Sequence, residues 1–145
     1  MILLADEASA TKKGGQELIG GLSVRVRRNH FGRQMESFVS NVDLPFLAPL
    51  STTFQGVFIR APVVEALLPG EGKPEGREEV EVLAVLPDRV KRGGGEEEVE
   101  GGAGDIVAVR QGNVFGTSFH PELTKDERIH VWWLGEVLKA IEAGC

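Results

Sequence analysis

A histidine and a glutamate stand close together in the segment Gly116 to Leu123, which reads G-T-S-F-H-P-E-L. The run Val114 to Phe119 predicts a strand that ends at His120, with Glu122 two residues further on. Working groups of α/β proteins gather at the carboxyl ends of strands. A carboxylate can fix the tautomer of a neighbouring imidazole and stabilise the imidazolium formed when the ring takes a proton from a nucleophile. Taken alone the motif is weak, because a strand-end histidine followed by a charge ahead of a helix has the same sequence.

Three arginines are candidates for holding a substrate carboxylate, namely Arg28, Arg33 and Arg60. Arg28 and Arg60 stand at the ends of predicted strands, where a small molecule could be gripped. The planar guanidinium matches the geometry of a carboxylate. Any one of them, considered singly, also fits a solvated surface charge.

The remaining histidines and the single cysteine carry weaker signals. His30 precedes Phe31 in a turn and is interpreted as a loop residue, whereas His130 lies inside the last predicted helix and is interpreted as structural. Cys145 stands alone, so no intrachain disulfide is possible, and a terminal thiol of this kind is expected to be inert. No metal site is predicted, because the spacing of these residues does not match a zinc site, and no cofactor is expected.

Periodicity predicts a mixture of strands and helices, and hence an α/β or α+β domain. A helix is expected over Met1 to Ala10, followed by a Gly-rich loop over Thr11 to Gly21. Strands are expected at Leu22–Arg28, Glu36–Val42, Gly56–Arg60, Val80–Leu86, Ile106–Arg110 and Val114–Phe119. Pro62 is expected to stop the third strand, and Gln111 to Asn113 to join the last two as a hairpin.

The C-terminal segment predicts a second helix. Thr124 and Glu127 have the spacing of a capping box, and the residues of one expected apolar face are Ile129, Trp133, Val137 and Ile141. The run from Lys91 to Gly104 is mostly Gly and Glu, so it is expected to be a disordered surface insertion within a single domain that spans residues 1–145.

Composition limits the classes of partner. The chain has 145 residues, 41% of them hydrophobic, a net charge of −6 and a pI of about 5.1. An acidic surface does not favour nucleic acid or anionic lipid as partners. No apolar run has the length of a membrane span and no signal peptide is recognised, so the expected location is the cytoplasm.

Four segments together resemble the glutaminase subunit of pyridoxal 5'-phosphate synthase, a class I glutamine amidotransferase. They are Arg28–Gln34 with Glu36–Phe38, Gly56–Pro62, Ala108–Gly112 and Ser118–Leu123. Their order and spacing are similar to the family's over essentially the whole chain, apart from longer inserts near Pro69–Glu78 and Lys91–Gly104. The resemblance implies an α/β fold, the C-terminal portion of a flavodoxin-like three-layer domain.

The resemblance also implies an activity. The family hydrolyses L-glutamine to glutamate and ammonia, and the ammonia passes to a synthase subunit that builds the vitamin B6 cofactor. His120 and Glu122 match the base and the orienting carboxylate of a Cys-His-Glu triad. Arg28, Ile59 and Arg60 match the residues that hold glutamine.

The resemblance leaves one essential residue unmatched. In the family the nucleophilic cysteine lies on a strand-to-helix turn just ahead of a helix similar to Met1–Ala5, so this sequence is expected to lack the nucleophile, part of the oxyanion hole and the first strands. We therefore expect no glutamine hydrolysis by the chain alone, together with an unpaired sheet edge and an uncovered core face. Two alternatives remain open: a catalytically inactive module that docks on the synthase subunit, and the glutaminase of another class I amidotransferase such as imidazole glycerol phosphate synthase.

Overall fold

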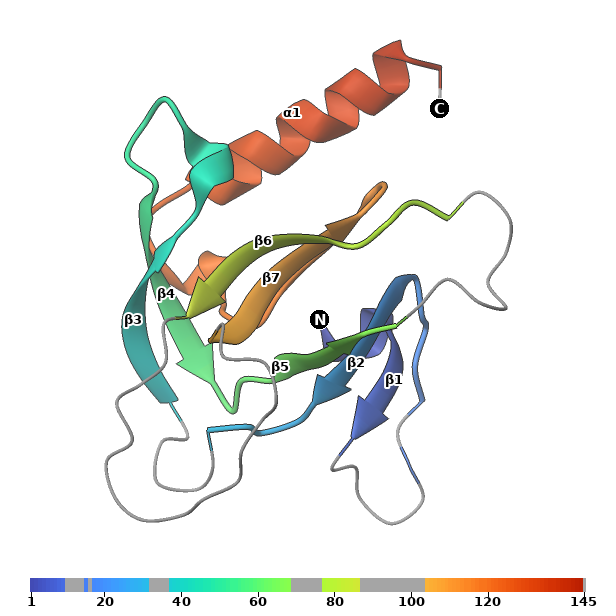
Figure 1. The fold of residues 1–145 in the computed structure, drawn as a ribbon. Helices are drawn as coiled ribbons and strands as arrows, with labels where there is room; N and C mark the ends of the chain where they lie inside the picture. Colours follow the sequence, from blue (N-terminus) through green and yellow to red (C-terminus); the bar gives the residue numbers. More distant parts are fainter. Residues whose placement is uncertain (10–14, 16, 32–36, 69–76, 87–103, 145) are drawn as a thin grey trace.

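The computed structural model describes residues 1–9, 15, 17–31, 37–68, 77–86 and 104–144. Figure 1 shows a curled sheet, a smaller two-stranded sheet at one end of it, and one C-terminal helix that runs along one side of both. The elements in chain order are η1 (Ile2–Leu4), β1 (Ala5–Ser9), β2 (Leu22–Arg27), β3 (Ser37–Asp43), η3 (Pro45–Leu47), β4 (Thr53–Ile59), β5 (Val63–Leu67), β6 (Glu81–Leu86), β7 (Asp105–Gln111), β8 (Val114–Thr117), η4 (Pro121–Leu123) and α1 (Arg128–Glu142).

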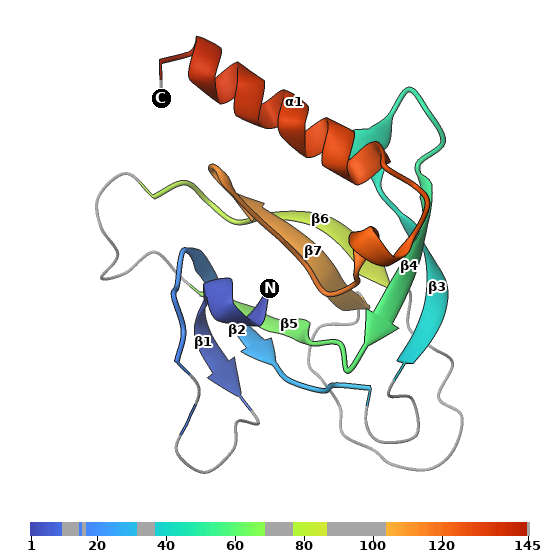
Figure 2. The same cartoon turned by 180° about the vertical axis from the view of Figure 1, so that it is seen from behind.

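The larger sheet has six strands in the order β1-β2-β5-β7-β6, and β8 pairs with β7. Strands β1 and β2 run parallel, whereas the β2–β5, β6–β7 and β7–β8 pairs are antiparallel. Strands β3 and β4 form the two-stranded sheet, in register from the Ser37–Ile59 pair to the Asp43–Thr53 pair. The rear view in Figure 2 shows the N-terminus and η1 near the hairpin of β7 and the strand that follows it.

All six predicted strands are present, and the predicted hairpin joins β7 to β8. β4 ends at Ile59, three residues before Pro62, so Pro62 is not the residue that stops it. The chain then turns into β5 at Val63, a strand that periodicity did not predict. Its five residues are bounded by Pro62 and by residues with no strand pattern, so the run is too short to show an alternation of its own.

The helix predicted over Met1 to Ala10 is wrong over residues 1–9, the part of this range that the structure describes. The chain makes a single 3-10 turn and then enters β1, where Ala5 is completely buried. The carbonyl of Leu3 accepts bonds from the amides of Ile19 and Gly20, at 2.7 and 3.2 Å. A short helix without an N-cap is marginal, and pairing with β2 satisfies the backbone better.

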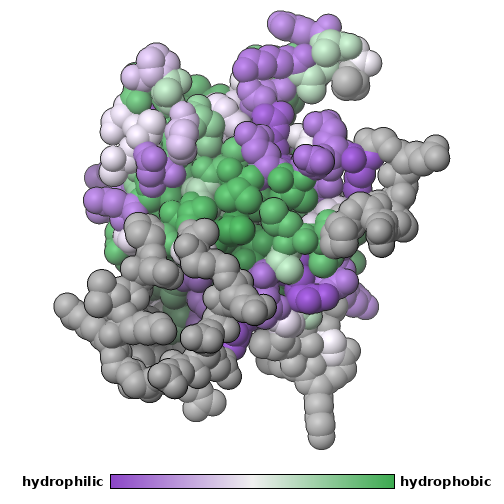
Figure 3. Space-filling model, in the orientation of Figure 1, coloured by the Kyte–Doolittle hydropathy of each residue, from purple (hydrophilic) through white to green (hydrophobic). Residues whose placement is uncertain are grey.

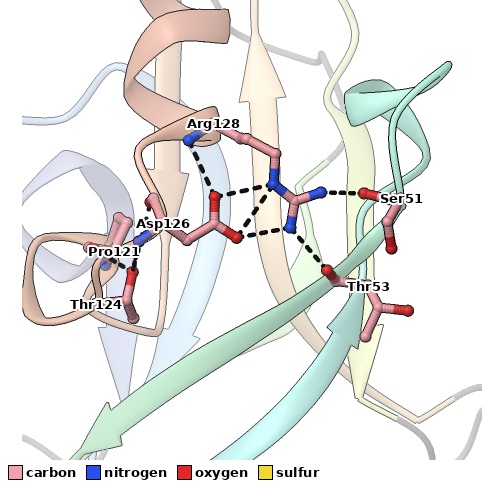
Figure 4. Close-up of polar contacts among 6 residues, drawn as sticks. All are labelled: Ser51, Thr53, Pro121, Thr124, Asp126 and Arg128. Carbon is pink, nitrogen blue, oxygen red and sulfur yellow. Dashed lines mark hydrogen bonds and ion pairs between the residues drawn. The ribbon is translucent and has the colours of Figure 1, made fainter.

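Helix α1 is confirmed, but its expected start is wrong. Glu127 occupies the N-cap position and makes no side-chain cap bond. Thr124 Oγ1 instead accepts the amide of Asp126 at 3.3 Å, and Asp126 Oδ1 accepts the amide of Arg128 at 3.1 Å, as Figure 4 shows. The aspartate rather than the threonine therefore satisfies the first free amide of the helix.

The expected apolar face of α1 is covered only at its beginning. Ile129 is buried, but Val137 and Ile141 are exposed, and so are Val131, Leu134 and Leu138. The C-terminal half of the helix leaves the sheet and lies open (Figure 1). Most of the stabilisation of α1 by packing must therefore come from its first two turns.

Two clusters of buried side chains form the core. One joins β3, β4, η3, β6 and β7 to the start of α1 and includes Phe54, Phe58 and Phe119, and the other joins η1, β1, β2, β5 and β7 around Val24 and Val26. Figure 3 shows apolar side chains gathered at the centre of the face seen in Figure 1, with hydrophilic residues around them. The two clusters share the central strand β7, which fixes the small sheet and the large sheet as one body.

Across the described ranges, no helix combines the length and apolar character needed to span a membrane. The insertion predicted at 91–104 lies outside the described residues except for Gly104. That glycine has a φ of +80°, and a Cβ there would lie 2.3 Å from the carbonyl oxygen of Leu86. Only glycine fits the entry to β7 without a shift of the backbone.

Candidate functional site

A hollow of about 760 Å³ opens beside the N-terminal turn, between the ends of β4 and β8, the η4 turn and the first half of α1. It brings together four of the predicted site residues, Ile59, Arg60, His120 and Glu122. The rest of its wall is mainly apolar and includes Met1, Leu3, Phe115, Ile129 and Trp133. Concave, largely apolar sites with a few convergent polar groups are typical of small-molecule binding.

His120 and Glu122 are in direct contact. His120 Nδ1 lies 2.8 Å from Glu122 Oε1, and the two side chains are 40% and 59% exposed. The structure therefore contains the hydrogen bond that the sequence predicted. With Nδ1 occupied by the carboxylate, Nε2 is the ring nitrogen that can exchange a proton with a reacting group.

The electrostatics of the pair favour an ionised glutamate. The hydrogen bond from His120 and a backbone hydrogen bond at Glu122 hold the pKa of the Glu122 carboxyl below its ordinary value of 4.5, and burial opposes them only in part. The charges of His120 and His130 also lower the pKa of Glu122. An ionised carboxylate at Nδ1 stabilises the imidazolium form of the ring.

The backbone around His120 is fixed by strands on both sides. Its amide donates to the carbonyl of Val57 in β4 at 2.8 Å, and the amide of Ser118 donates to Val107 in β7, also at 2.8 Å. The ring of Phe119 packs against Phe54 and Phe58. Gly56 allows this approach, because a Cβ there would lie 3.2 Å from the Phe119 ring. His120 therefore emerges from a rigid part of the molecule, as a site residue requires.

Arg60 reaches the hollow because β4 ends beside it. Ile59 is the last residue of β4 and is 42% exposed, and Arg60 follows with a φ of +44°. A left-handed backbone is uncommon for a residue with a side chain and persists only where surrounding contacts enforce it. The turn thus directs the end of β4 toward the same hollow that holds His120.

The other two arginines are placed differently. Arg28 follows β2 and its amide donates to Ser9 at 3.5 Å, but it is not among the described residues that line the hollow. Arg33 lies outside the described residues. The predicted role of Arg28 in holding substrate stays a prediction.

Sequence reasoning did not assign several of the residues that line the hollow to the site. His130 and Trp133 of α1 line the hollow, and Ser118 Oγ lies 3.3 Å from the sulfur of Met1 at its base. His30 is also more enclosed than expected of a loop residue, because its Nε2 lies 2.9 Å from Asp105 Oδ1. His130 and Trp133 lie one and four residues after the buried Ile129. This spacing was the available sequence signal that the first half of α1 lines the hollow.

A second hollow of about 800 Å³ lies under the start of α1, against the loop that connects β3 to β4. Two of its four charged residues, Asp126 and Arg128, are paired with each other, with Arg128 Nη2 2.6 Å from Asp126 Oδ2 and 2.8 Å from the carbonyl of Thr53. Arg128 also donates to the carbonyl of Ser51 (Figure 4). This network fastens α1 to the β3–β4 connection. In the described parts of the chain, no group of three or more His, Cys, Asp or Glu residues could hold a metal ion.

Comparison with known proteins gives the same fold and family. Residues 1–139 match the model of the SNO glutamine amidotransferase family. A solved structure described as a glutamine amidotransferase superposes with a TM-score of 0.64 at 40% identity, over 93% of this chain and 55% of that chain. The predicted fold class, an α/β class I glutamine amidotransferase domain, is confirmed.

Curated relatives are similar over nearly the whole chain. The chain is 41% identical to the probable pyridoxal 5'-phosphate synthase subunit PDX2 of Arabidopsis thaliana, over 99% of this chain and 57% of the relative. It is 43% identical to the pyridoxal 5'-phosphate synthase subunit PdxT of Kineococcus radiotolerans, over 97% and 58% of the two chains. The chain thus spans a little over half the length of these relatives. On these matches and the shared fold, the chain belongs to the SNO glutamine amidotransferase family.

Proposed function

We propose that this chain supplies the histidine–glutamate pair and the substrate-holding arginine of a glutaminase that hydrolyses L-glutamine for pyridoxal 5'-phosphate synthesis. The observation that carries the proposal is the 2.8 Å contact between His120 Nδ1 and Glu122 Oε1 at the mouth of a hollow that also contains Arg60. Relatives with 41% and 43% identity are named as subunits of pyridoxal 5'-phosphate synthase, which supports this choice of pathway.

The proposed chemistry follows from these positions. Glu122 holds the imidazole so that His120 Nε2 takes the proton of a cysteine thiol, and the thiolate attacks the side-chain amide carbon of glutamine. The imidazolium returns the proton to the departing nitrogen, and ammonia leaves. A water molecule, activated by the same imidazole, then cleaves the thioester and releases glutamate. Arg60 binds the α-carboxylate of glutamine, and Arg28 is proposed to assist it.

The thiol is the component that this sequence does not place in the site. Its only cysteine is Cys145, outside the described residues, and by family resemblance the nucleophile stands just ahead of Met1. The hollow beside Met1 is where such a residue would meet His120, since Met1 and His120 line it together. A longer protein that includes this segment is therefore the proposed active form, and its ammonia is proposed to pass to a synthase subunit in the cytoplasm.

The test is release of ammonia and glutamate from L-glutamine in the presence of the synthase partner. The 145-residue chain is measured beside a version extended upstream to the next in-frame start. We expect activity only in the extended version, and a loss of roughly 10²–10⁴-fold in kcat when His120→Asn is introduced there, because general base catalysis is removed.

Other results would favour the alternatives. If neither version hydrolyses glutamine but the short chain binds the synthase partner tightly, the chain is a docking or regulatory module. If the extended version is active but is stimulated only by the synthase subunit of another amidotransferase, such as imidazole glycerol phosphate synthase, the assignment to vitamin B6 synthesis is wrong.

A further inference from the structure

His30 joins three segments that lie at the same end of the molecule (Figures 1 and 2). It stands in the turn that follows β2. Its amide donates to the carbonyl of Ala61 in the β4–β5 turn at 3.3 Å, and its Nε2 lies 2.9 Å from Oδ1 of Asp105, the first residue of β7. One residue therefore contacts both turns and the start of β7.

The contact between His30 and Asp105 is partly shielded from solvent, so it can help to hold the two segments together. Their side chains are 23% and 31% exposed, so water weakens the contact less than it weakens a fully exposed pair. The His30 ring also meets the edge of Phe31, whose ring meets Phe58 in β4. The imidazole is therefore held from the β7 side and from the β4 side.

An imidazole at position 30 carries a free-energy cost of burial. His30 Nδ1 is buried and has no hydrogen-bond partner among the described residues. Burial of an unpaired ring nitrogen is unfavourable, and an apolar side chain would avoid it. The 2.9 Å contact of Nε2 with Asp105 is thus the feature that distinguishes histidine from a space-filling residue here.

The two residues that precede the bonded pair have left-handed backbones. Asn29, just before His30, has a φ of +47°, and Arg60, just before Ala61, has a φ of +44°. Asparagine tolerates this conformation, but arginine adopts it only under constraint. The bond between His30 and Ala61 links the two turns directly after these residues, so it constrains both.

The backbone of Arg60 decides where its guanidinium points. Arg60 leaves the end of β4 at the wall of the hollow that contains His120 and Glu122. An arginine holds a carboxylate well only when its fork is correctly oriented, and a displacement of about 1 Å can cost roughly 10²-fold in rate. Contacts that hold the β4–β5 turn therefore also determine how well Arg60 can bind a substrate carboxylate.

We propose that His30 and Asp105 are positioning residues, which hold the β4–β5 turn so that Arg60 is oriented toward the α-carboxylate of an L-amino-acid amide substrate. The inference rests on the proposed glutaminase function and adds a determinant of substrate affinity to it. Neither residue touches the reacting atoms, so the expected effect is on binding rather than on the chemical step.

The experiment measures steady-state glutamine hydrolysis by the extended protein with its synthase partner. The variants are His30→Ala, Asp105→Ala, the double substitution and His30→Gln. We expect His30→Ala and Asp105→Ala each to raise KM for L-glutamine about tenfold while kcat changes by less than about twofold, because ground-state and transition-state binding are weakened equally. The double substitution should be no worse than either single one.

His30→Gln is the conservative variant that should restore function. Its side-chain amide can donate to Asp105 and leaves no ring nitrogen buried, so KM should return to within about threefold of the parent. The matched control is Arg77→Ala, which removes a similar half-buried ion pair: Arg77 Nη1 lies 2.6 Å from Asp6 Oδ2, with exposures of 30% and 24%. It should lower the melting temperature without changing KM.

The outcomes separate this inference from the proposed function. An unsubstituted extended protein that hydrolyses no glutamine overturns both. An active parent whose His30→Ala variant shifts KM no more than Arg77→Ala does, or whose His30→Gln variant fails to recover, overturns the positioning role alone. A tenfold rise in KM in His30→Ala that is absent from the His30→Gln variant supports the positioning role.

Discussion

His120 is held at two points, by its amide on Val57 and by its Nδ1 on Glu122. The first fixes where the residue leaves the sheet and the second fixes how the ring is turned. Both are needed for a base, because an imidazole that rotates freely presents the correct nitrogen only part of the time. Titration of the His120–Glu122 pair can therefore test the geometry of the site in the isolated chain.

The Glu122 carboxyl should titrate at a lower pH in the folded chain than in the unfolded one. Its folded pKa lies below 4.5, so pairing with His120 stabilises the folded chain above about pH 4.5. This contribution to the free energy of unfolding is lost as the pH falls through the folded pKa. A titration followed by NMR of the Glu122 carboxyl carbon should show this low midpoint. In His120→Ala, which removes the donor, the midpoint should rise toward the ordinary value, and an unchanged midpoint would contradict the hydrogen bond as its main cause.

At the scale of elements, Gln111 connects two strands that are not neighbours in the sheet. It is buried at the end of β7, where its Oε1 accepts the amide of Ser23 in β2 at 2.7 Å and its Nε2 donates to the carbonyl of Glu78 at 2.6 Å. Ser23 is buried as well, although strict alternation along β2 places it on the polar face. The side-chain amide thus satisfies backbone groups that the strands themselves leave unpaired.

Gln111→Leu should destabilise the chain by roughly 2–3 kcal/mol, since it leaves the amide of Ser23 buried without a partner. Chemical denaturation followed by circular dichroism measures the change. Gln55→Leu is the matched control, because Gln55 is exposed on β4 and the substitution should change stability by less than about 0.5 kcal/mol. Equal effects of the two substitutions would show that the Gln111 network is not a main support of the sheet.

At the scale of the whole molecule, the most unusual feature is the amount of apolar surface along α1. Val131, Leu134, Leu138 and Ile141 are each at least 60% exposed, and they follow one another at spacings of three and four residues along one side of the helix. Contiguous apolar surface of this kind is a site of association or aggregation.

The isolated chain should therefore self-associate at micromolar concentration and above, as measured by sedimentation velocity. Leu134→Lys with Leu138→Lys should reduce the association without loss of stability, because both side chains are already exposed. Val39→Lys with Leu50→Lys replaces exposed apolar residues outside α1 and should leave the association unchanged. Association that is insensitive to the α1 substitutions would place the contact elsewhere.

The sequence by itself determined six of the eight described strands, the C-terminal helix, the family and the residue types of the site. These rest on local patterns, such as the alternation in Leu22–Arg27 and the segment around His120, which neighbouring residues encode directly. The local pattern failed at Met1–Ala10, where bonds to Ile19 and Gly20 and pairing with β2 replaced the expected helix.

Only the tertiary structure decided which of these residues meet. It placed Arg60 and His120 in the wall of one hollow and His30 against Asp105, and Arg28 is not among the described residues of that wall. Such contacts depend on the order of strands in the sheet and on two left-handed turns, neither of which has a periodic signal in the sequence. The physical reason is that long-range pairing is selected by the total burial and hydrogen bonding of the fold rather than by the preferences of adjacent residues.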